Sequence, residues 1–208
     1  MSGIDHLVLA CADLAQGGRF VRERLGVDVQ PGGRHALMGT HNALLKLGPR
    51  TYLELIAVDP GGCAQRPRWF GLDTPAVGRR AARQPFLLTW VARTGDIAEA
   101  VARVPMLGTI LALSRGAFSW RIAVPDDGSL CFDGVLPTLI QWDGEPHPAA
   151  GLPDEGCELV GVALSHLRAA DIAPLFRELA VGGAVQLSAG PLDLAALIRA
   201  PHGVIELR

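Results

Sequence analysis

The chain has 208 residues, of which 49% are hydrophobic and 19% are charged, and these values are typical of a soluble globular protein. Nineteen basic and 21 acidic residues leave a net charge of −2 without any basic run, which argues against a nucleic-acid partner. No segment has the length of a membrane span, and no basic region precedes the first apolar run, so we expect neither membrane association nor a signal peptide.

The first predicted elements are a strand, a helix and three further strands. The apolar run IDHLVLA (4–10) precedes Asp13, whose carboxylate can cap a helix that ends at Gly26. The further strands are predicted at 34–39, 42–48 and 51–58. In the last of them Glu54 stands among apolar residues, and a carboxylate buried there needs a cation, a metal or several hydrogen-bond donors.

The same order of elements recurs twice along the chain. The motif ADLA (12–15) returns as GDIA (95–98) and ADIA (170–173), each time after an apolar run and before a helix-like segment. The predicted caps and helix stops are Asp96 and Gly108 in the second unit, and Asp171 and Gly182 in the third. The final strands each carry one polar residue: Glu54, Gln141 and Glu206. Chance matches in an alanine-rich chain remain the alternative, above all for the third unit.

These repeats give the predicted domain organisation. Residues 59–84 are rich in Gly, Pro and Arg, and a connection of this length is typical of a linker or a lid. The expected parts are a first βαβββ unit at 1–58, the linker or lid loop at 59–84, a second unit at 85–143, a linker at 144–156 and a third, shorter unit at 157–208.

Paired βαβββ units, with a histidine early in the first strand and a glutamate in the fourth, resemble the vicinal oxygen chelate superfamily, which includes glyoxalase I, extradiol dioxygenases and bleomycin-resistance proteins. More narrowly, IDHLVLACADL, GGRHALMGTHNALLKLG, TYLELIAVDP and RPRWFGLD resemble its glyoxalase-like domain branch. The resemblance implies an α+β fold, in which repeated βαβββ units with curled mixed sheets enclose a pocket and a shorter βαβββ-like unit is added.

The resemblance also implies a divalent metal, of unknown identity, between the first and last strands of both units. Carried over by position, its ligands are His6, Glu54 and Gln141, and Glu54 is also the candidate for moving a proton. Imidazole, carboxylate and amide oxygen suit a borderline or hard ion. Thr89 occupies the fourth position, where a neutral hydroxyl is a poor ligand. An ion pair between Glu54 and an arginine remains the alternative.

A further group of residues is expected to bind substrate. They are His35, His41, Asn42, Trp69, Phe70, Trp120 and Arg121. The first three also suit the caps of a hairpin, and the Trp69–Phe70 pair suits either a lid over an apolar ligand or an anchor for the linker. Trp120 and Arg121 point to opposite faces of a strand, so only one of them can enter a pocket.

Two functions remain open on the sequence. One is a small-molecule enzyme of the lyase, isomerase or dioxygenase type that acts through vicinal oxygens. The other is a non-catalytic protein that sequesters an apolar or aromatic small molecule. Two units in one chain are expected to complete one pocket per monomer, whether the protein is a monomer or a homodimer. Four scattered cysteines without a C-x-x-C pair favour reduced thiols and a cytoplasmic location.

Overall fold

The computed structural model describes residues 3–208 and shows an α+β protein built from repeated βαβββ units; Met1 and Ser2, which begin the first predicted unit, lie outside the described residues. The first unit contains β1 (Gly3–Ala10), α1 (Leu14–Leu25), β2 (Gln30–His35), β3 (Thr40–Gly48) and β4 (Thr51–Val58). Asp13 caps α1 and Gly26 ends it in the left-handed conformation, as predicted. The strand predicted at 34–39 is shifted, because β2 ends at residue 35 and a turn follows.

The second unit follows a helical lid segment, by which we mean residues 59–84. This segment contains η1 (Trp69–Gly71) and α2 (Pro75–Arg83). The unit contains β5 (Phe86–Arg93), α3 (Ile97–Arg103), η2 (Pro105–Leu107), β6 (Thr109–Arg115), β7 (Phe118–Val124), η3 (Cys131–Gly134) and β8 (Thr138–Trp142). Asp96 caps α3 by accepting a hydrogen bond from the Glu99 amide at 3.0 Å, as predicted. The predicted helix stop at Gly108 is wrong, because α3 ends at Arg103 and Gly108 follows the separate turn η2.

The third unit follows the short helix α4 (Pro148–Gly151). It contains β9 (Glu158–His166), α5 (Ala169–Glu178), β10 (Val185–Ala189), β11 (Asp193–Ala200) and β12 (Gly203–Leu207). The cap and stop predicted here are wrong. Helix α5 begins after Arg168, and Asp171 lies inside its first turn, where its Oδ2 pairs with Arg168 Nε at 2.8 Å. The helix also ends at Glu178, ahead of Gly182.

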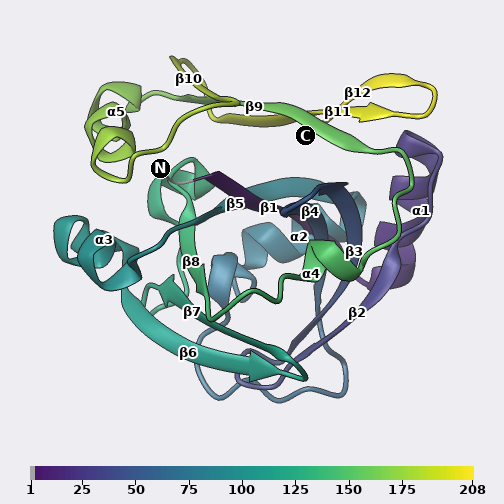
Figure 1. The fold of residues 1–208 in the computed structure, drawn as a ribbon, viewed down its shortest axis with the longest axis horizontal. Helices are drawn as coiled ribbons and strands as arrows, with labels where there is room; N and C mark the ends of the chain where they lie inside the picture. Colours follow the sequence, from purple (N-terminus) through teal and green to yellow (C-terminus); the bar gives the residue numbers. More distant parts are fainter. Residues whose placement is uncertain (1–2) are drawn as a thin grey trace.

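Units one and two form a single eight-stranded sheet with the order β2-β3-β4-β1-β5-β8-β7-β6. The first strands of the two units, β1 and β5, pair antiparallel at its centre, and each lies parallel to the last strand of its own unit. The sheet curls until its two end strands, β2 and β6, approach each other (Figure 1), and Arg115 at the end of β6 reaches His35 of β2 at 3.2 Å. The curled sheet therefore has an enclosed inner face.

The third unit has its own four-stranded sheet with the order β10-β9-β11-β12. It repeats the order of elements but not the strand pairing, since β9 lies between β10 and β11 and not beside β12. This sheet and α5 lie along the outer face of the larger sheet (Figure 1). There Leu7, Trp90, Ile172 and Phe176 share one apolar core. The third unit thus supports the outer face and leaves the inner face to the pocket.

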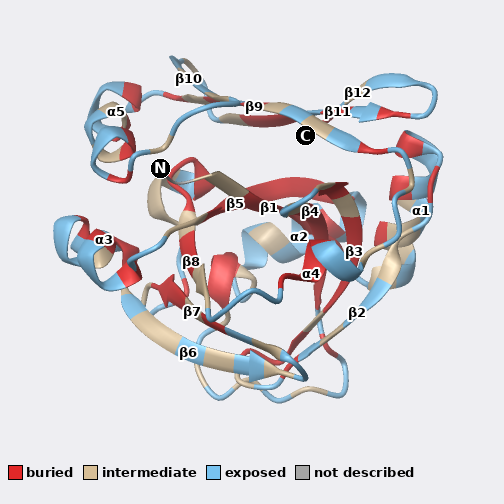
Figure 2. Ribbon diagram, in the orientation of Figure 1, coloured by how far each residue is buried: buried red, intermediate tan, exposed pale blue. Residues whose placement is uncertain are grey.

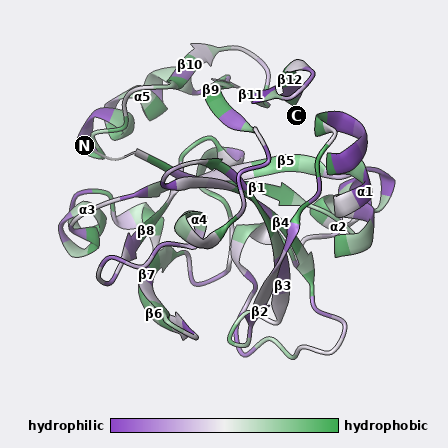
Figure 3. Cartoon of the chain, turned by 45° about the vertical axis from the view of Figure 1, so that its right-hand side comes forward, coloured by the Kyte–Doolittle hydropathy of each residue, from purple (hydrophilic) through white to green (hydrophobic). Residues whose placement is uncertain are grey.

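Alternation along the central strands decides which side chains enter the pocket. Figure 2 shows β1, β4 and β5 buried at the centre of the molecule, and Figure 3 shows β5 coloured as hydrophobic. On β1, Leu7 and Leu9 join the outer core, whereas His6 and Val8 face inward. Within residues 3–208, none of the helices combines the length and the apolar character needed to cross a membrane.

Candidate functional site

A cluster of buried polar side chains lies on the inner face of the curled sheet. Alternation on β4 puts Tyr52, Glu54 and Ile56 on this face, and Glu54 lies near His6 of β1, as the resemblance implied. Glu54 is only 5% exposed, so its carboxylate needs partners within the protein. Its Oε1 accepts a hydrogen bond from Asn42 Nδ2 at 2.6 Å, and its Oε2 lies 3.6 Å from His6 Nε2. Glu54 is thus bonded to Asn42 and faces His6 across a gap.

Asp5, next to His6 on β1, is a fully buried carboxylate with three donors around it. Its Oδ1 lies 2.8 Å from His6 Nδ1, and its Oδ2 lies 2.9 Å from Trp142 Nε1 and 3.2 Å from His147 Nε2. Burial raises the pKa of Asp5, but the hydrogen bonds from His147 and His6 outweigh burial and hold this pKa well below its usual range. Asp5 is therefore an ionised acceptor at physiological pH.

The hydrogen bonds to Asp5 fix the tautomers of two histidines. His147 Nδ1 accepts the Ala149 amide hydrogen at 3.2 Å, so its Nε2 carries the proton that goes to Asp5. The same carboxylate only accepts, so His6 Nδ1 also carries a proton. In the neutral imidazole, the Nε2 atom of His6 is then an acceptor that faces Glu54. A histidine held in this way can serve as a base or as a ligand.

Unit two contributes a cation to the cluster. Arg115 Nη1 lies 3.2 Å from His35 Nε2 and 3.4 Å from Asn42 Oδ1. The Gly33 amide also donates to Asn42 Oδ1, at 2.8 Å. Both donors fix the orientation of the Asn42 amide, whose nitrogen therefore points to Glu54.

Two glycines on β2 allow the side chains of Asn42 and Arg115 to lie against this strand. A Cβ atom on Gly32 would lie 2.1 Å from Asn42 Oδ1, and one on Gly33 would lie 2.8 Å from Arg115 Cδ. Both residues lie in a strand, where the absence of a side chain admits Asn42 and Arg115.

Burial also determines the charge of the histidine and the tyrosine nearby. Burial, followed by the Arg115 guanidinium, lowers the pKa of His35 to about 3, so this imidazole is neutral and can accept from Arg115. Its Nδ1 lies 3.0 Å from Thr40 Oγ1. Burial, with a smaller effect of Asp5, raises the pKa of Tyr52 well above 10, and its ring stacks on His6 with 4.6 Å between centroids.

A small cavity of about 30 Å³ lies among these groups, and a space of this size holds about one water molecule. Unit one and Arg115 of unit two supply its polar side. The remaining wall is apolar and aromatic: Trp69 and Phe70 from the lid segment, Trp120, Ile122, Ile140 and Trp142 from unit two, and Pro148. Trp69 and Phe70 are each only 3% exposed, so their rings belong to the buried wall of the cavity.

Gln141, predicted to converge with His6 and Glu54, lies on the other face. Its neighbours Ile140 and Trp142 line the cavity, so alternation turns the Gln141 side chain outward. There its Oε1 accepts a hydrogen bond from the Ile97 amide at 2.9 Å, at the start of α3. The predicted three-residue cluster is therefore wrong, and Gln141 supports a helix.

His41 and Arg121 also lie on the outer face, which corrects their assignment to the pocket. His41 is paired in register with Ala57, a member of the outer core. Arg121 Nη2 lies 3.5 Å from Asp143 Oδ1 in a partly exposed ion pair. Of the two neighbours predicted to oppose each other, it is Trp120 that enters the cavity.

The donor set does not fit the four-ligand metal site implied by the resemblance. His6 Nε2 and Glu54 Oε2, 3.6 Å apart, are close enough to share one ion at bond lengths of about 2.1 Å. The positions carried over from unit two supply no ligand, because Gln141 faces α3 and the Thr89 hydroxyl donates to a backbone carbonyl at 2.9 Å.

The remaining polar groups cannot complete such a site. His35 Nε2 faces Arg115, and the charge of this guanidinium opposes a cation beside it. In the part of the chain that the structure describes, no group of three or more His, Cys, Asp or Glu side chains is arranged to hold a metal. The cluster is better suited to hydrogen bonding and proton transfer.

Several site residues were not assigned from the sequence. They are Asp5, Tyr52, Arg115, Trp142 and His147. Asp5 gave the same signal as Glu54, a carboxylate within an apolar strand, and Trp142 follows Ile140 by the strand period. Arg115 gave no signal, because its approach to β2 depends on how far the sheet curls.

Comparisons with known proteins agree with this fold. A family model described as "Glyoxalase-like domain" matches residues 4–180. A hypothetical protein from Staphylococcus aureus has a similar structure, with a TM-score of 0.59 and 14% identity over 99% of this chain and 84% of that one. Methylmalonyl-CoA epimerase from Streptomyces coelicolor, in complex with 2-nitronate-propionyl-CoA, has a TM-score of 0.43 and 20% sequence identity. That match covers 74% of this chain and 99% of the epimerase chain. No curated protein matches the sequence.

Proposed function

Because the chain belongs to the glyoxalase-like domain family of the vicinal oxygen chelate superfamily, we propose that it is a small-molecule enzyme of the lyase or isomerase type. The reaction moves a proton at a carbon next to a carbonyl group. The observation that carries the proposal is the buried pair of proton acceptors, Glu54 Oε2 and His6 Nε2, that face each other across 3.6 Å.

In the proposed reaction Glu54 accepts the proton from the substrate carbon. The electron pair of the broken C–H bond moves onto the carbonyl oxygen and forms an enolate. Arg115 is the cation among the cavity-lining residues, and its guanidinium donates hydrogen bonds to the new oxyanion. The proton then returns to the same carbon or to its neighbour, or a bond to a leaving group on the adjacent carbon breaks.

His6 has two tasks in this proposal. Asp5 holds its ring by the Nδ1 hydrogen bond, and the bare Nε2 can accept a proton from a substrate hydroxyl and pass it on. His6 and Arg115 both line the cavity, so a substrate with two neighbouring oxygens, one for each residue, is favoured.

The donor set supports proton transfer more than ring-cleaving oxygenation. The non-haem iron sites of many oxygenases use two histidines and one carboxylate. Here His6 and Glu54 supply one of each, but the second nearby histidine, His35, faces Arg115.

Binding without turnover is the second candidate, and the aromatic wall favours it. Trp69, Phe70, Trp120 and Trp142 all line the cavity and suit a flat, apolar compound. In this case the polar cluster would fix the orientation of the ligand and perform no chemistry.

Solvent exchange distinguishes the two candidates. The protein is incubated in D₂O with adducts of dicarbonyl compounds and thiols, and deuterium at the carbon next to the carbonyl is followed by NMR. Catalysed exchange that falls at least about a hundredfold in Glu54→Gln supports the enzyme. Gln141→Ala, on the outer face, is the matched control and should exchange at the original rate. Tight binding without exchange would support sequestration.

A further inference from the structure

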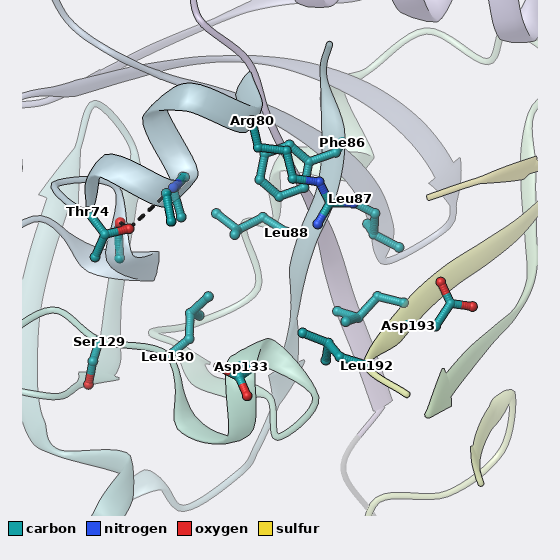
Figure 4. Close-up of a pocket in the computed structure, with 14 residues that line it drawn as sticks. Thr74, Arg80, Phe86, Leu87, Leu88, Ser129, Leu130, Asp133, Leu192 and Asp193 are labelled. Carbon is teal, nitrogen blue, oxygen red and sulfur yellow. Dashed lines mark hydrogen bonds between the residues drawn. The ribbon is translucent and has the colours of Figure 1, made fainter. Parts of the chain in front are cut away.

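A second and larger cavity lies apart from the polar cluster. It has a volume of about 440 Å³, within the range of small-molecule sites. The cavity lies between α2 of the lid segment, the start of β5, the η3 turn and the β10–β11 turn of the third unit (Figure 4). It shares none of its lining residues with the smaller cavity.

The lining is mostly aliphatic. In Figure 4 the side chains of Leu88, Leu130 and Leu192 point into a common space, and Val77 and Leu194 add to it. Leu192 is 49% exposed, a high value for a leucine beside a cavity. An apolar ligand segment would cover this surface.

One cation stands at this cavity without a partner. Arg80 extends from α2 over the ring of Phe86, with 3.9 Å from its Cζ to the ring centroid (Figure 4). Among residues 3–208 no carboxylate lies within ion-pair distance of its guanidinium, and no hydrogen bond satisfies it. Its fork of donors is therefore available to a ligand.

The two carboxylates at the cavity already have hydrogen-bond partners. Asp133 Oδ2 lies 3.2 Å from Nε2 of His166, whose Nδ1 accepts from the Arg168 amide, and Asp193 pairs with Arg208. The field of Asp193 still acts on Arg80, which lies across the cavity from it. Arg80 is thus the cation of the cavity lining, and among the described residues no carboxylate pairs with its guanidinium.

We propose that this cavity binds an amphipathic monoanion, such as a medium-chain carboxylate, with its chain among the leucines and its carboxylate on Arg80. Carboxylate and guanidinium match in a two-point geometry, and the aliphatic walls fit an alkyl chain better than a polar ligand. This site is separate from the proposed reaction and does not depend on it.

Calorimetric titration with sodium decanoate tests the proposal on the full-length chain. We expect saturable binding that weakens about tenfold in Arg80→Gln, because one charge-assisted contact is lost. Arg79→Gln is the matched control, since it removes the neighbouring exposed charge, which does not line the cavity. Titration with 1-decanol, which has the same chain without the charge, should not distinguish Arg80→Gln from the original protein.

A second variant tests the position of the chain. Ala76→Trp fills the cavity from α2 and should abolish decanoate binding, whereas Ala82→Trp on the same helix, outside the lining, should retain it. No binding at millimolar decanoate, equal binding by Arg80→Gln, or unchanged binding by Ala76→Trp would each overturn the proposal.

Discussion

Asp5 Oδ1 and His6 Nδ1 lie 2.8 Å apart, although side chains at consecutive strand positions normally point to opposite faces. The pairing of β1 with β5 shifts its register between Ile4 and His6, and this irregularity turns the two side chains toward each other. The bulge thus brings the carboxylate and the imidazole of two adjacent residues into contact, and the pair is oriented before any substrate binds.

Asp5→Asn is expected to lower the rate of solvent exchange by about two orders of magnitude, because the replacement no longer fixes the Nδ1–H tautomer of His6. Asp5 acts here as a positioning residue, so the pH dependence of the exchange rate should change together with the rate itself. Thermal unfolding of the same variant tells a catalytic loss from a folding loss. An unchanged rate would show that Asp5 serves only the fold.

Asp5→Ala tests the structural part of the same network. It leaves the donors of His6, Trp142 and His147 buried without their acceptor, and removing one partner of a buried charged network typically costs about 3–5 kcal/mol. Denaturant unfolding measures the free energy of unfolding. A loss below about 1 kcal/mol would mean that water replaces the carboxylate.

Arg115→Gln should reduce the exchange rate by at least about tenfold through loss of the charge that stabilises the enolate. Arg121→Gln is the matched control on the neighbouring strand, since it removes a guanidinium that points outward to Asp143. Equal effects of the two substitutions would indicate a general effect of net charge, and the role of Arg115 in the reaction would be refuted.

Elemental analysis of the protein, purified without chelators, should find less than one equivalent of any divalent transition metal. The reason is the incomplete donor set around His6 and Glu54. One full equivalent that disappears in Glu54→Ala would contradict the donor-set argument and restore a metal to the site.

The free energy of unfolding should fall as the pH is lowered from about 6.5 toward 3. His35 has a pKa of about 3 in the folded protein, while a histidine in an unfolded chain titrates near 6.5. Between these values the unfolded chain binds a proton that the folded chain excludes, at a cost of up to about 1.4 kcal/mol per pH unit. Above pH 6.5 His35 is neutral in both states and contributes nothing. Denaturant unfolding at pH 7.5 and 5 should show a smaller difference in His35→Gln, and an unchanged one in the exposed control His202→Gln.

The sequence predicted the parts of the site that depend on short-range regularity. Period-two alternation separated Trp120 from Arg121, and the family resemblance placed His6 and Glu54 at one pocket. Alternation alone did not say which face of its strand Gln141 takes, because the period of two does not identify the inner face.

Features that depend on long-range geometry could not be predicted from the sequence. A bulge in β1 turns Asp5 toward His6. The curl of the whole sheet places Arg115 beside His35, and the linker after β8 places His147 beside Asp5. The third unit repeats the element order of the others, but pairs its strands differently.

The hydrogen bond from His147 to Asp5 has a consequence for how this chain can be built and rearranged. His147 and Pro148 belong to the connection ahead of the third unit, yet the first contacts Asp5 and the second lines the small cavity. During synthesis, Asp5 near the N-terminus can therefore form this hydrogen bond only after the ribosome has released the segment that contains His147. A truncation just after β8 would also remove His147 and Pro148 from the site, so units one and two alone do not carry the complete site.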